Sequence, residues 1–346
     1  MPRIAIAVLA LALAAASAAE AAGYKAPRTA FGHPDLQGLW TNTAVTFLQR
    51  PPNFKNLILT EAEAEQLAAG FRKMVEPLIS EAPIDPNLPA PPEVEEVQNA
   101  DFIEMQLAAG RIDGKPRSSW IVDPADGRLP LSDAGRQLGR ELTRYRYDSY
   151  EYRPKDERCL TAIGSPEGPP MMNSGFNGHY QVVQTRDHVA ILVEMNHDVR
   201  IVRLTDRKRP ADPVRSWLGD SIGWWEGDTL VVETTNLRPN TFIGSLGGGF
   251  AYGPRARLTE RFTRTGPGDI LYQFEVEDPD VFTRVWRAEM PWRAAKGPIY
   301  EYACHEGNYS LENILAGARA QDREATGKPA TPPPPAAAPA PAAGQP

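Results

Sequence analysis

The pattern of apolar and polar residues between positions 179 and 306 is typical of β-strands. Short segments rich in Val, Ile, Tyr, Phe and Trp follow one another there, and Gly, Asp, Asn and Pro separate them. The expected strands lie at 180–185, 188–195, 199–204, 221–225, 229–236, 256–264, 270–276, 283–291 and 299–304, with a further one near Trp40. Closing such a sheet removes its unpaired edges. The pattern therefore predicts a mainly β protein, built as an antiparallel up-and-down barrel or a strongly curved sheet.

Outside these strands, apolar residues recur with the period of a helix. The segment from Thr60 to Val75 opens with an N-cap threonine and a capping-box glutamate. Shorter helices are expected at 101–109 and 132–145. A last helix, at 311–323, is expected to pack against the sheet through one apolar face, made of Leu311, Ile314, Leu315 and Ala318. The prediction is thus a β domain with N-terminal helical segments and one C-terminal helix.

Composition divides the chain into four parts. Residues 1–22 combine a basic Arg3, an apolar run and small residues, which is typical of a cleaved secretory signal peptide. Residues 23–150 are expected to hold the first strand and the helical and loop segments that pack on the sheet, including a Pro-rich linker at 82–92. Residues 151–325 are expected to form the antiparallel β domain with its C-terminal helix, and residues 326–346 are a Pro/Ala tail expected to be disordered. The mature protein is therefore expected in the periplasm or outside the cell.

Charge and hydropathy exclude two classes of partner. The formal net charge is −7, and no basic stripe suited to phosphate contacts occurs, so we expect no nucleic acid partner. No stretch after the signal peptide approaches the roughly 20 apolar residues of a membrane span. A small-molecule ligand is the expected partner, and no motif indicates a cofactor or sets the oligomeric state.

The chain has two cysteines, Cys159 and Cys304. In an oxidising compartment a lone pair of cysteines is typical of a disulfide. A redox or metal role is normally accompanied by Cys-x-x-Cys spacing, which is absent. We therefore predict that the two residues are bonded to each other.

Histidine is the natural candidate for acid–base chemistry near neutral pH, and the chain has five. His197-Asp198 lies between two expected strands, and His305-Glu306 follows the last one. Strand ends are where barrels gather polar groups, so these histidines are candidate general bases, with Asp198, Glu194 or Glu306 as partners. The alternative is that His197 belongs to a plain turn and His305 to a solvated loop.

Strand pairing adds a specific expectation. If Arg186-Asp187 form a two-residue turn, His179 lies opposite Glu194 on the same face of the sheet, so that an imidazole meets a carboxylate. If Asn196-His197 form the next turn, Glu194 lies opposite Val199 and His197 stays at the rim.

Other chemistries find less support. A metal site could draw on His179, His197, His305, Glu194 and Glu306, but no ligand spacing on a helix or strand supports it, and none is predicted. Cys304 and His305 are neighbours, and neighbours along a strand point to opposite faces, which argues against a cysteine nucleophile. No Gly-x-Ser-x-Gly elbow of a serine hydrolase occurs.

Aromatic residues are numerous in the strands and are expected to line or fill a barrel interior. They include Trp224, Trp225, Tyr272, Phe274, Trp286, Trp292, Tyr300 and Tyr302. The ordinary interpretation is a packed core. The alternative is a roomy interior that binds an apolar or aromatic compound, with His179, Trp224 and Trp225 as contacts and Arg200 or Arg158 holding an anionic group.

Three stretches together resemble a large uncharacterised group of exported bacterial proteins. They are RSSWIVDPADGR at 117–128, GWWEGDTLVVETTN at 223–236 and PIYEYACHEGNYSLEN at 298–313. The resemblance implies a shared fold and export, and no activity. A second likeness is to lipocalin-type, calycin-like barrels, because Gly38-Leu39-Trp40 is similar to their Gly-x-Trp opening and a helix follows the last strand.

These observations lead to three hypotheses. The first is an exported β-barrel enzyme that performs hydrolysis, elimination or isomerisation on a small, largely apolar or aromatic compound, with His197 and His305 as bases. The second is a periplasmic carrier of such compounds without enzymatic activity. The third is an envelope interaction module that uses the Pro/Ala tail as a spacer.

Overall fold

The computed structural model covers the whole chain, and the structure describes residues 24–75 and 108–326, apart from 163, 176, 246–247 and 307. The expected signal peptide, the Pro-rich linker, nearly all of the helix at 101–109 and the Pro/Ala tail lie outside the described residues.

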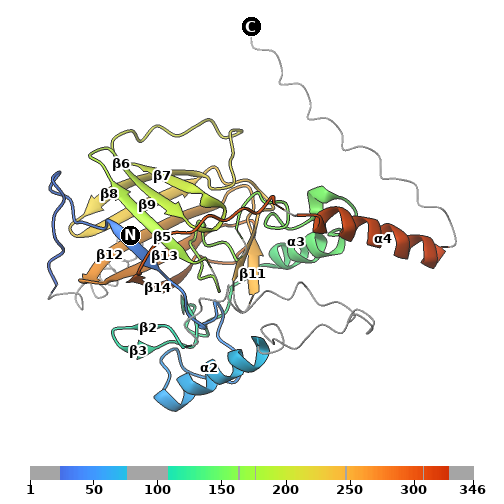
Figure 1. Cartoon of the computed structure of the whole chain (residues 1–346), viewed down its shortest axis with the longest axis horizontal. Coiled ribbons are helices and arrows are strands. Elements are labelled where there is room, and N and C mark those ends of the chain that lie inside the picture. The colour runs from blue at the N-terminus through green and yellow to red at the C-terminus, as the bar shows by residue number, and fades with distance from the viewer. Residues whose placement is uncertain are drawn as a thin grey trace, which may run out of the picture.

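Nine strands form a closed barrel (Figure 1). Around the barrel they are β1 (Gly38–Thr41), β5 (His179–Gln184), β6 (His188–Val193), β7 (Val199–Arg203), β8 (Asp220–Glu226), β9 (Thr229–Thr235), β12 (Arg257–Gly266), β13 (Asp269–Glu277) and β14 (Trp286–Ala294). The pairing of β14 with β1 closes the ring, and β4 (Ile121–Asp123) also pairs with β14. The mainly β prediction is confirmed.

The β5–β6 hairpin has the expected register, because Gln184 pairs with Val189 and Tyr180 with Val193. The β6–β7 register differs by two residues from the expected one, since Leu192 pairs with Val199. The reason is a longer turn at η4 (Met195–His197), which has a 3-10 type of hydrogen bonding but contains Asn196 in a non-helical conformation. A shift of two residues keeps every side chain on its expected face of the sheet.

Two features depart from a simple up-and-down antiparallel barrel. β7 and β8 are parallel, because the long connection at 204–219 brings the start of β8 back beside the last residues of β7, where Ser221 pairs with Val202. The strand expected at 299–304 does not form, and these residues run as coil and turn. Once β14 pairs with β1 the sheet has no free edge for another strand at that seam.

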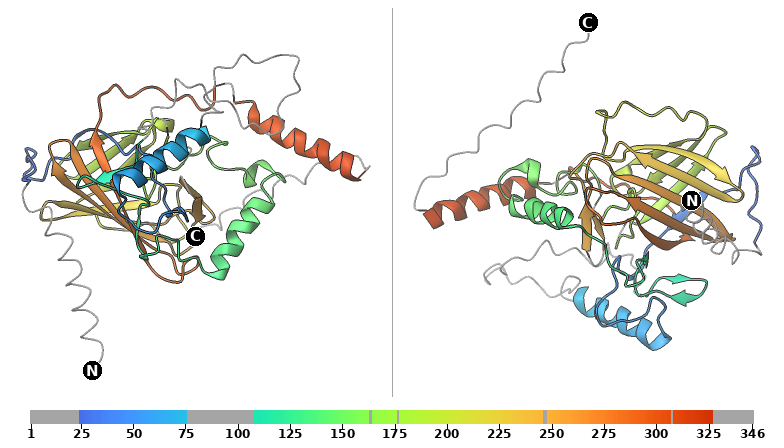
Figure 2. Two further views of the ribbon diagram at one scale, coloured as in Figure 1. Left: turned by 90° about the horizontal axis from the view of Figure 1, so that it is seen from below. Right: turned by 180° about the vertical axis from the view of Figure 1, so that it is seen from behind.

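Helices and short strands lie outside the barrel (Figure 2). They are α2 (Glu61–Val75), β2 (Arg111–Ile112), β3 (Lys115–Pro116), α3 (Asp133–Arg144), η3 (Tyr150–Tyr152), β10 (Phe242–Ser245), β11 (Gly248–Ala251) and α4 (Ser310–Thr326). The expected capping box of α2 is present, because the Thr60 amide donates to Glu63 Oε2 at 2.8 Å and the Glu63 amide donates to Thr60 Oγ1 at 3.2 Å. The apolar face of α2 packs on the loop that follows β1, through Leu67 and Phe71.

The last helix does not pack against the sheet as expected. α4 has no buried residue and projects away from the barrel (Figures 1 and 2). Its apolar positions, Leu311, Ile314, Leu315 and Ala318, are only partly buried. The helix is tied instead to the turn after α3, where Arg319 donates to the backbone oxygen of Asp148 at 3.0 Å.

The barrel interior is a packed core. Tyr180 stacks on Trp292 with ring centroids 4.3 Å apart, and Tyr272, Phe274 and Trp286 are fully buried around them. A ten-residue segment at 165–174 is buried along its whole length. Its backbone groups are satisfied inside, since the Met171 amide donates to Tyr272 Oη at 2.9 Å. We call residues 165–174 the plug segment.

The core also contains an ion pair. Arg200 donates two hydrogen bonds to Glu260, at 2.9 and 2.6 Å, and both side chains are buried. Tyr272 Oη donates to the same carboxylate at 2.7 Å, and Ser221 and Thr234 lie against the guanidinium. Burial alone would lower the pKa of Arg200, but the charge and hydrogen bonds of Glu260 outweigh burial and raise it.

Candidate functional site

A pocket of about 300 Å³ lies at the rim of the barrel, between the β6–β7 turn and the segment that follows β14. We call it the rim pocket. Asn196 and His197 line it on one side, residues 301–306 line it on the other, and Cys159 completes it. His197, His305 and Glu306, all candidates from the sequence, therefore meet in one place. Glu301 and Tyr302 also line it. Glu301 was not among the candidates, and Tyr302 was expected in the barrel interior, because the sequence pattern assigned this stretch to a strand.

The β6–β7 turn presents His197 to the pocket. Asn196 and His197 both have positive φ, at 60° and 45°, a conformation that costs energy for residues other than glycine. Hydrogen bonds hold the turn, from the His197 amide to Glu194 O at 3.1 Å and from the Val193 amide to Asp198 O at 2.8 Å. The His197 side chain is exposed as a result.

A disulfide holds the opposite wall of the rim pocket in place. Cys159 and Cys304 are bonded, with Cα atoms 5.7 Å apart, as predicted. The bond fixes the segment that carries His305 and Glu306 against the loop before the plug segment. Asn308 Nδ2 reinforces this by donating to the Glu157 backbone oxygen at 3.1 Å.

The expected contact between His179 and Glu194 is confirmed. His179 Nδ1 lies 2.7 Å from Glu194 Oε2, and the Tyr300 amide donates to Glu194 Oε1 at 2.9 Å. Burial alone would raise the pKa of Glu194, but the hydrogen bonds from His179 and Tyr300 outweigh it and lower the pKa. Glu194 is therefore ionised near neutral pH, and His179 Nδ1 donates to it. The pair does not line the pocket; it anchors the segment at Tyr300 to the barrel.

Asp198 lies beside the pocket in an acidic environment. Burial raises the pKa of its carboxyl to about 6, and the charge of Glu167 adds to the rise, while His197 and Lys155 oppose it. Glu167 belongs to the plug segment, is fully buried and pairs with Lys155 at 3.3 Å. Sequence reasoning missed Glu167 and Lys155, since nothing local in the sequence shows that a Pro-rich loop is buried.

The raised pKa of Asp198 predicts a specific dependence of stability on pH. The folded protein holds the proton more tightly than the unfolded chain, so the stabilising contribution is complete below about pH 4 and is lost as pH rises through about 6. Asp198→Asn removes this loss, and we expect the variant to be about 1 kcal/mol more stable than the wild type at pH 7.5, after discounting for partial exposure. Denaturant unfolding at pH 4.5 and 7.5 measures it. A stability difference that is the same at both pH values would contradict the assignment.

The remaining candidates lie elsewhere. Arg200 is inside the barrel with Glu260. Trp224 and Trp225 are partly exposed near the far end of β8, and the parallel register of β7 and β8 places that end away from the rim pocket. Trp225 stacks on His33, and Arg158 covers the ring of Tyr150.

Within the described ranges, no three His, Cys, Asp or Glu side chains gather closely enough to hold a metal ion. None of the helices in those ranges is long and apolar enough to cross a membrane. Comparisons of the chain with models of protein families, with curated proteins and with solved structures found no match. The chemistry of the rim pocket is therefore argued from its own residues.

Proposed function

We propose that the protein is an exported enzyme that performs acid–base chemistry on a small polar molecule held in the rim pocket. The observation that carries the proposal is the meeting of His197 and His305 in one pocket, although the two lie far apart in the sequence. Two imidazoles facing one volume supply both a proton acceptor and a proton donor near neutral pH.

The neighbours of each imidazole support complementary roles. Asp198 adjoins His197 and, with a pKa of about 6, changes charge in the same pH range as an ordinary imidazole. Glu306 adjoins His305 in the pocket wall. We assign His197 with Asp198 as the proton acceptor and His305 with Glu306 as the proton donor. Hydrolysis, elimination and isomerisation all use such a pair.

The residues that line the rim pocket also narrow the class of substrate. A volume of about 300 Å³ suits a small molecule, and two glutamates in the wall disfavour an anion, so we propose a neutral or cationic polar compound. A largely apolar or aromatic substrate has less support, because the aromatic residues that suggested it fill the barrel core. The filled interior equally disfavours a carrier that holds its cargo inside the barrel.

The experiment is untargeted metabolite profiling. A complex extract of bacterial small molecules is incubated with the wild type, with the His197→Gln/His305→Gln double variant and with His188→Gln, and is followed by mass spectrometry. His188 is an exposed histidine at the opposite end of β6, so its variant is a matched control. We expect a compound that the wild type and the control consume and the double variant does not.

Each single substitution should then lower kcat/KM for that compound by about 100-fold to 10,000-fold, the usual contribution of a general acid or base. Circular dichroism checks that the exposed substitutions leave the fold intact. Equal consumption by the double variant, or no consumption by the wild type, would rule the proposal out.

A further inference from the structure

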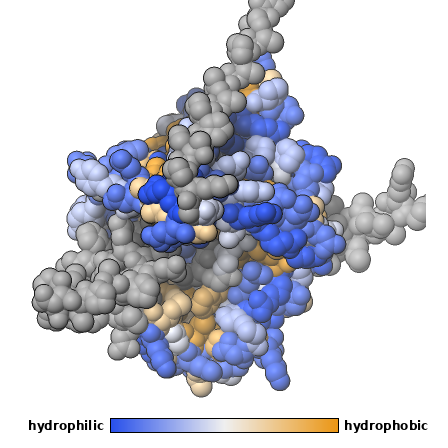
Figure 3. Space-filling model, turned by 90° about the vertical axis from the view of Figure 1, so that its right-hand side faces the viewer, coloured by the Kyte–Doolittle hydropathy of each residue, from blue (hydrophilic) through white to orange (hydrophobic). Residues whose placement is uncertain are grey.

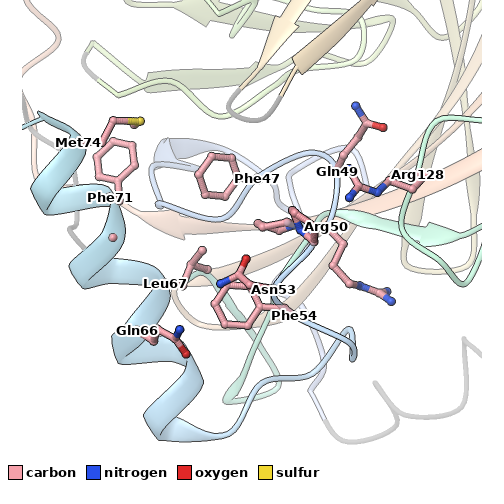
Figure 4. Close-up of a pocket in the computed structure, with 13 residues that line it drawn as sticks. Phe47, Gln49, Arg50, Asn53, Phe54, Gln66, Leu67, Phe71, Met74 and Arg128 are labelled. Atoms are coloured by element: carbon pink, nitrogen blue, oxygen red, sulfur yellow. The ribbon is translucent and has the colours of Figure 1, made fainter.

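A second hollow lies outside the barrel, between α2 and the loop at 47–54, with a volume of about 350 Å³ (Figure 4). We call it the α2 groove. Its walls are apolar, formed by Leu67, Phe71 and Met74 from the helix and by Phe47 and Phe54 from the facing loop. In Figure 3, apolar surface gathers in the lower part of the molecule, at the level of α2.

Two arginines line the side of the groove away from the helix (Figure 4). Arg50 is only 7% exposed and donates to the Lys55 backbone oxygen at 3.0 Å rather than to a carboxylate. Its buried Nε has no hydrogen-bond partner in the part of the chain that the structure describes. A buried guanidinium without a direct counter-ion is unusual, because burying a charge is costly unless it is paired.

The charges around Arg50 leave this cost uncompensated. Burial lowers the pKa of Arg50, the neighbouring Arg128 lowers it further, and Asp126 acts against both. Asp126 is exposed, and its Oδ1 accepts a hydrogen bond from the Arg128 amide at 3.0 Å. Among the described residues, two positive charges thus face one exposed carboxylate, although the protein as a whole carries −7. A bound anion would complete the pairing.

We propose that the α2 groove binds a small amphiphilic anion, with an aromatic or alkyl body against the phenylalanines and one carboxylate or sulfonate at Arg50 and Arg128. The apolar walls supply affinity through burial of the body, and the arginines supply selectivity for the acidic group. This binding site is separate from the rim pocket and does not depend on the function proposed there.

The test compares two fluorescent probes of similar shape. 1-Anilinonaphthalene-8-sulfonate carries one sulfonate, and N-phenyl-1-naphthylamine has the same rings without it. Fluorescence titration of the full chain should show binding of both, with the sulfonate bound about tenfold more tightly. No binding of the sulfonate, or equal affinity for both probes, would overturn the proposal.

Two substitutions, each with a matched control, test whether the probes bind in the α2 groove. Gly70 lines the groove, and a Cβ added there meets no atom within 4 Å, so Gly70→Leu places an apolar side chain at the groove without a clash at its Cβ. Gly139 in α3 has equally open surroundings, and Gly139→Leu is the matched control. We expect the first substitution to weaken both probes about tenfold or more by occupying the apolar space, and the control to leave them unchanged. If Gly70→Leu has no effect, the probes bind elsewhere and the proposal fails.

Arg128→Gln tests the charge, because this exposed arginine contributes little to the fold. The sulfonate should bind about fivefold to tenfold more weakly, while the neutral probe changes less than about twofold. Arg140→Gln, at an exposed position on α3, is the control that removes the same net charge. An equal loss for both probes, or an equal loss in the control, would show that the arginine does not recognise the acidic group.

Discussion

Replacing Glu260 by leucine is expected to lower the free energy of unfolding by about 4 kcal/mol, because Arg200 would stay charged and unpaired inside the barrel. Glu260 accepts two hydrogen bonds from Arg200 and one from Tyr272, and none of these donors reaches water. Denaturant unfolding followed by tryptophan fluorescence measures the loss.

The double variant Arg200→Met/Glu260→Leu is the control for this prediction. Removing both charges abolishes the cost of an unpaired guanidinium, so the double variant should recover more than half of the lost stability. A double variant less stable than Glu260→Leu alone would mean that packing around the pair, rather than its charge, sets the stability of the core.

Removing the disulfide is the other change with a large expected effect. Its cysteines are separated by 145 positions, and releasing a loop of that length should lower the free energy of unfolding by about 5 kcal/mol in the chain-entropy model. The Cys159→Ala/Cys304→Ala variant should also lose the activity proposed for the rim pocket, because His305 and Glu306 follow Cys304 directly. Unfolding midpoints and metabolite consumption measure the two effects.

Reduction of the wild type provides an independent check. Under a thiol reductant, the wild type should unfold at the midpoint of the double-alanine variant, since both chains then lack the cross-link. An oxidised wild type and a double-alanine variant with the same midpoint would contradict the structural role of the bond.

The parts of the fold that depend on local pattern could be predicted from the sequence. The alternation of apolar and polar residues predicted the barrel strands from β5 to β14. The strand pairing expected from a two-residue turn at Arg186-Asp187 placed His179 opposite Glu194. Even where the next turn was longer than expected, the side chains kept their faces, because the register moved by two residues.

The parts that depend on distant partners could not be predicted in this way. The parallel pairing of β7 with β8 depends on the path of the long connection between them. The alternation of apolar and polar residues carries no information about that path. The expected strand at 299–304 has the composition of a strand, but closure of β14 on β1 leaves it no edge. Its position across the rim is nevertheless what brings His305 to His197.

The burial of the plug segment also could not be predicted from the sequence. Its Pro-rich start is typical of an exposed loop, yet tyrosine hydroxyls inside the barrel bind its backbone, as Tyr272 does for Met171. That burial places Glu167 near Asp198 and contributes to the raised pKa of Asp198. Part of the rise in the pKa of Asp198, beside the effect of its own burial, therefore comes from a residue that the sequence pattern would leave in solvent.

The most direct test of the account is the imidazole region of a ¹H–¹³C spectrum of histidine-labelled protein. The chain has five histidines, so five signals are expected, and single substitutions assign them. If His197 and His305 face one pocket, His197→Gln should shift the His305 signal, while His188→Gln should leave it in place. A His305 signal that does not respond to His197→Gln would contradict the shared pocket, and with it the proposed acid–base site.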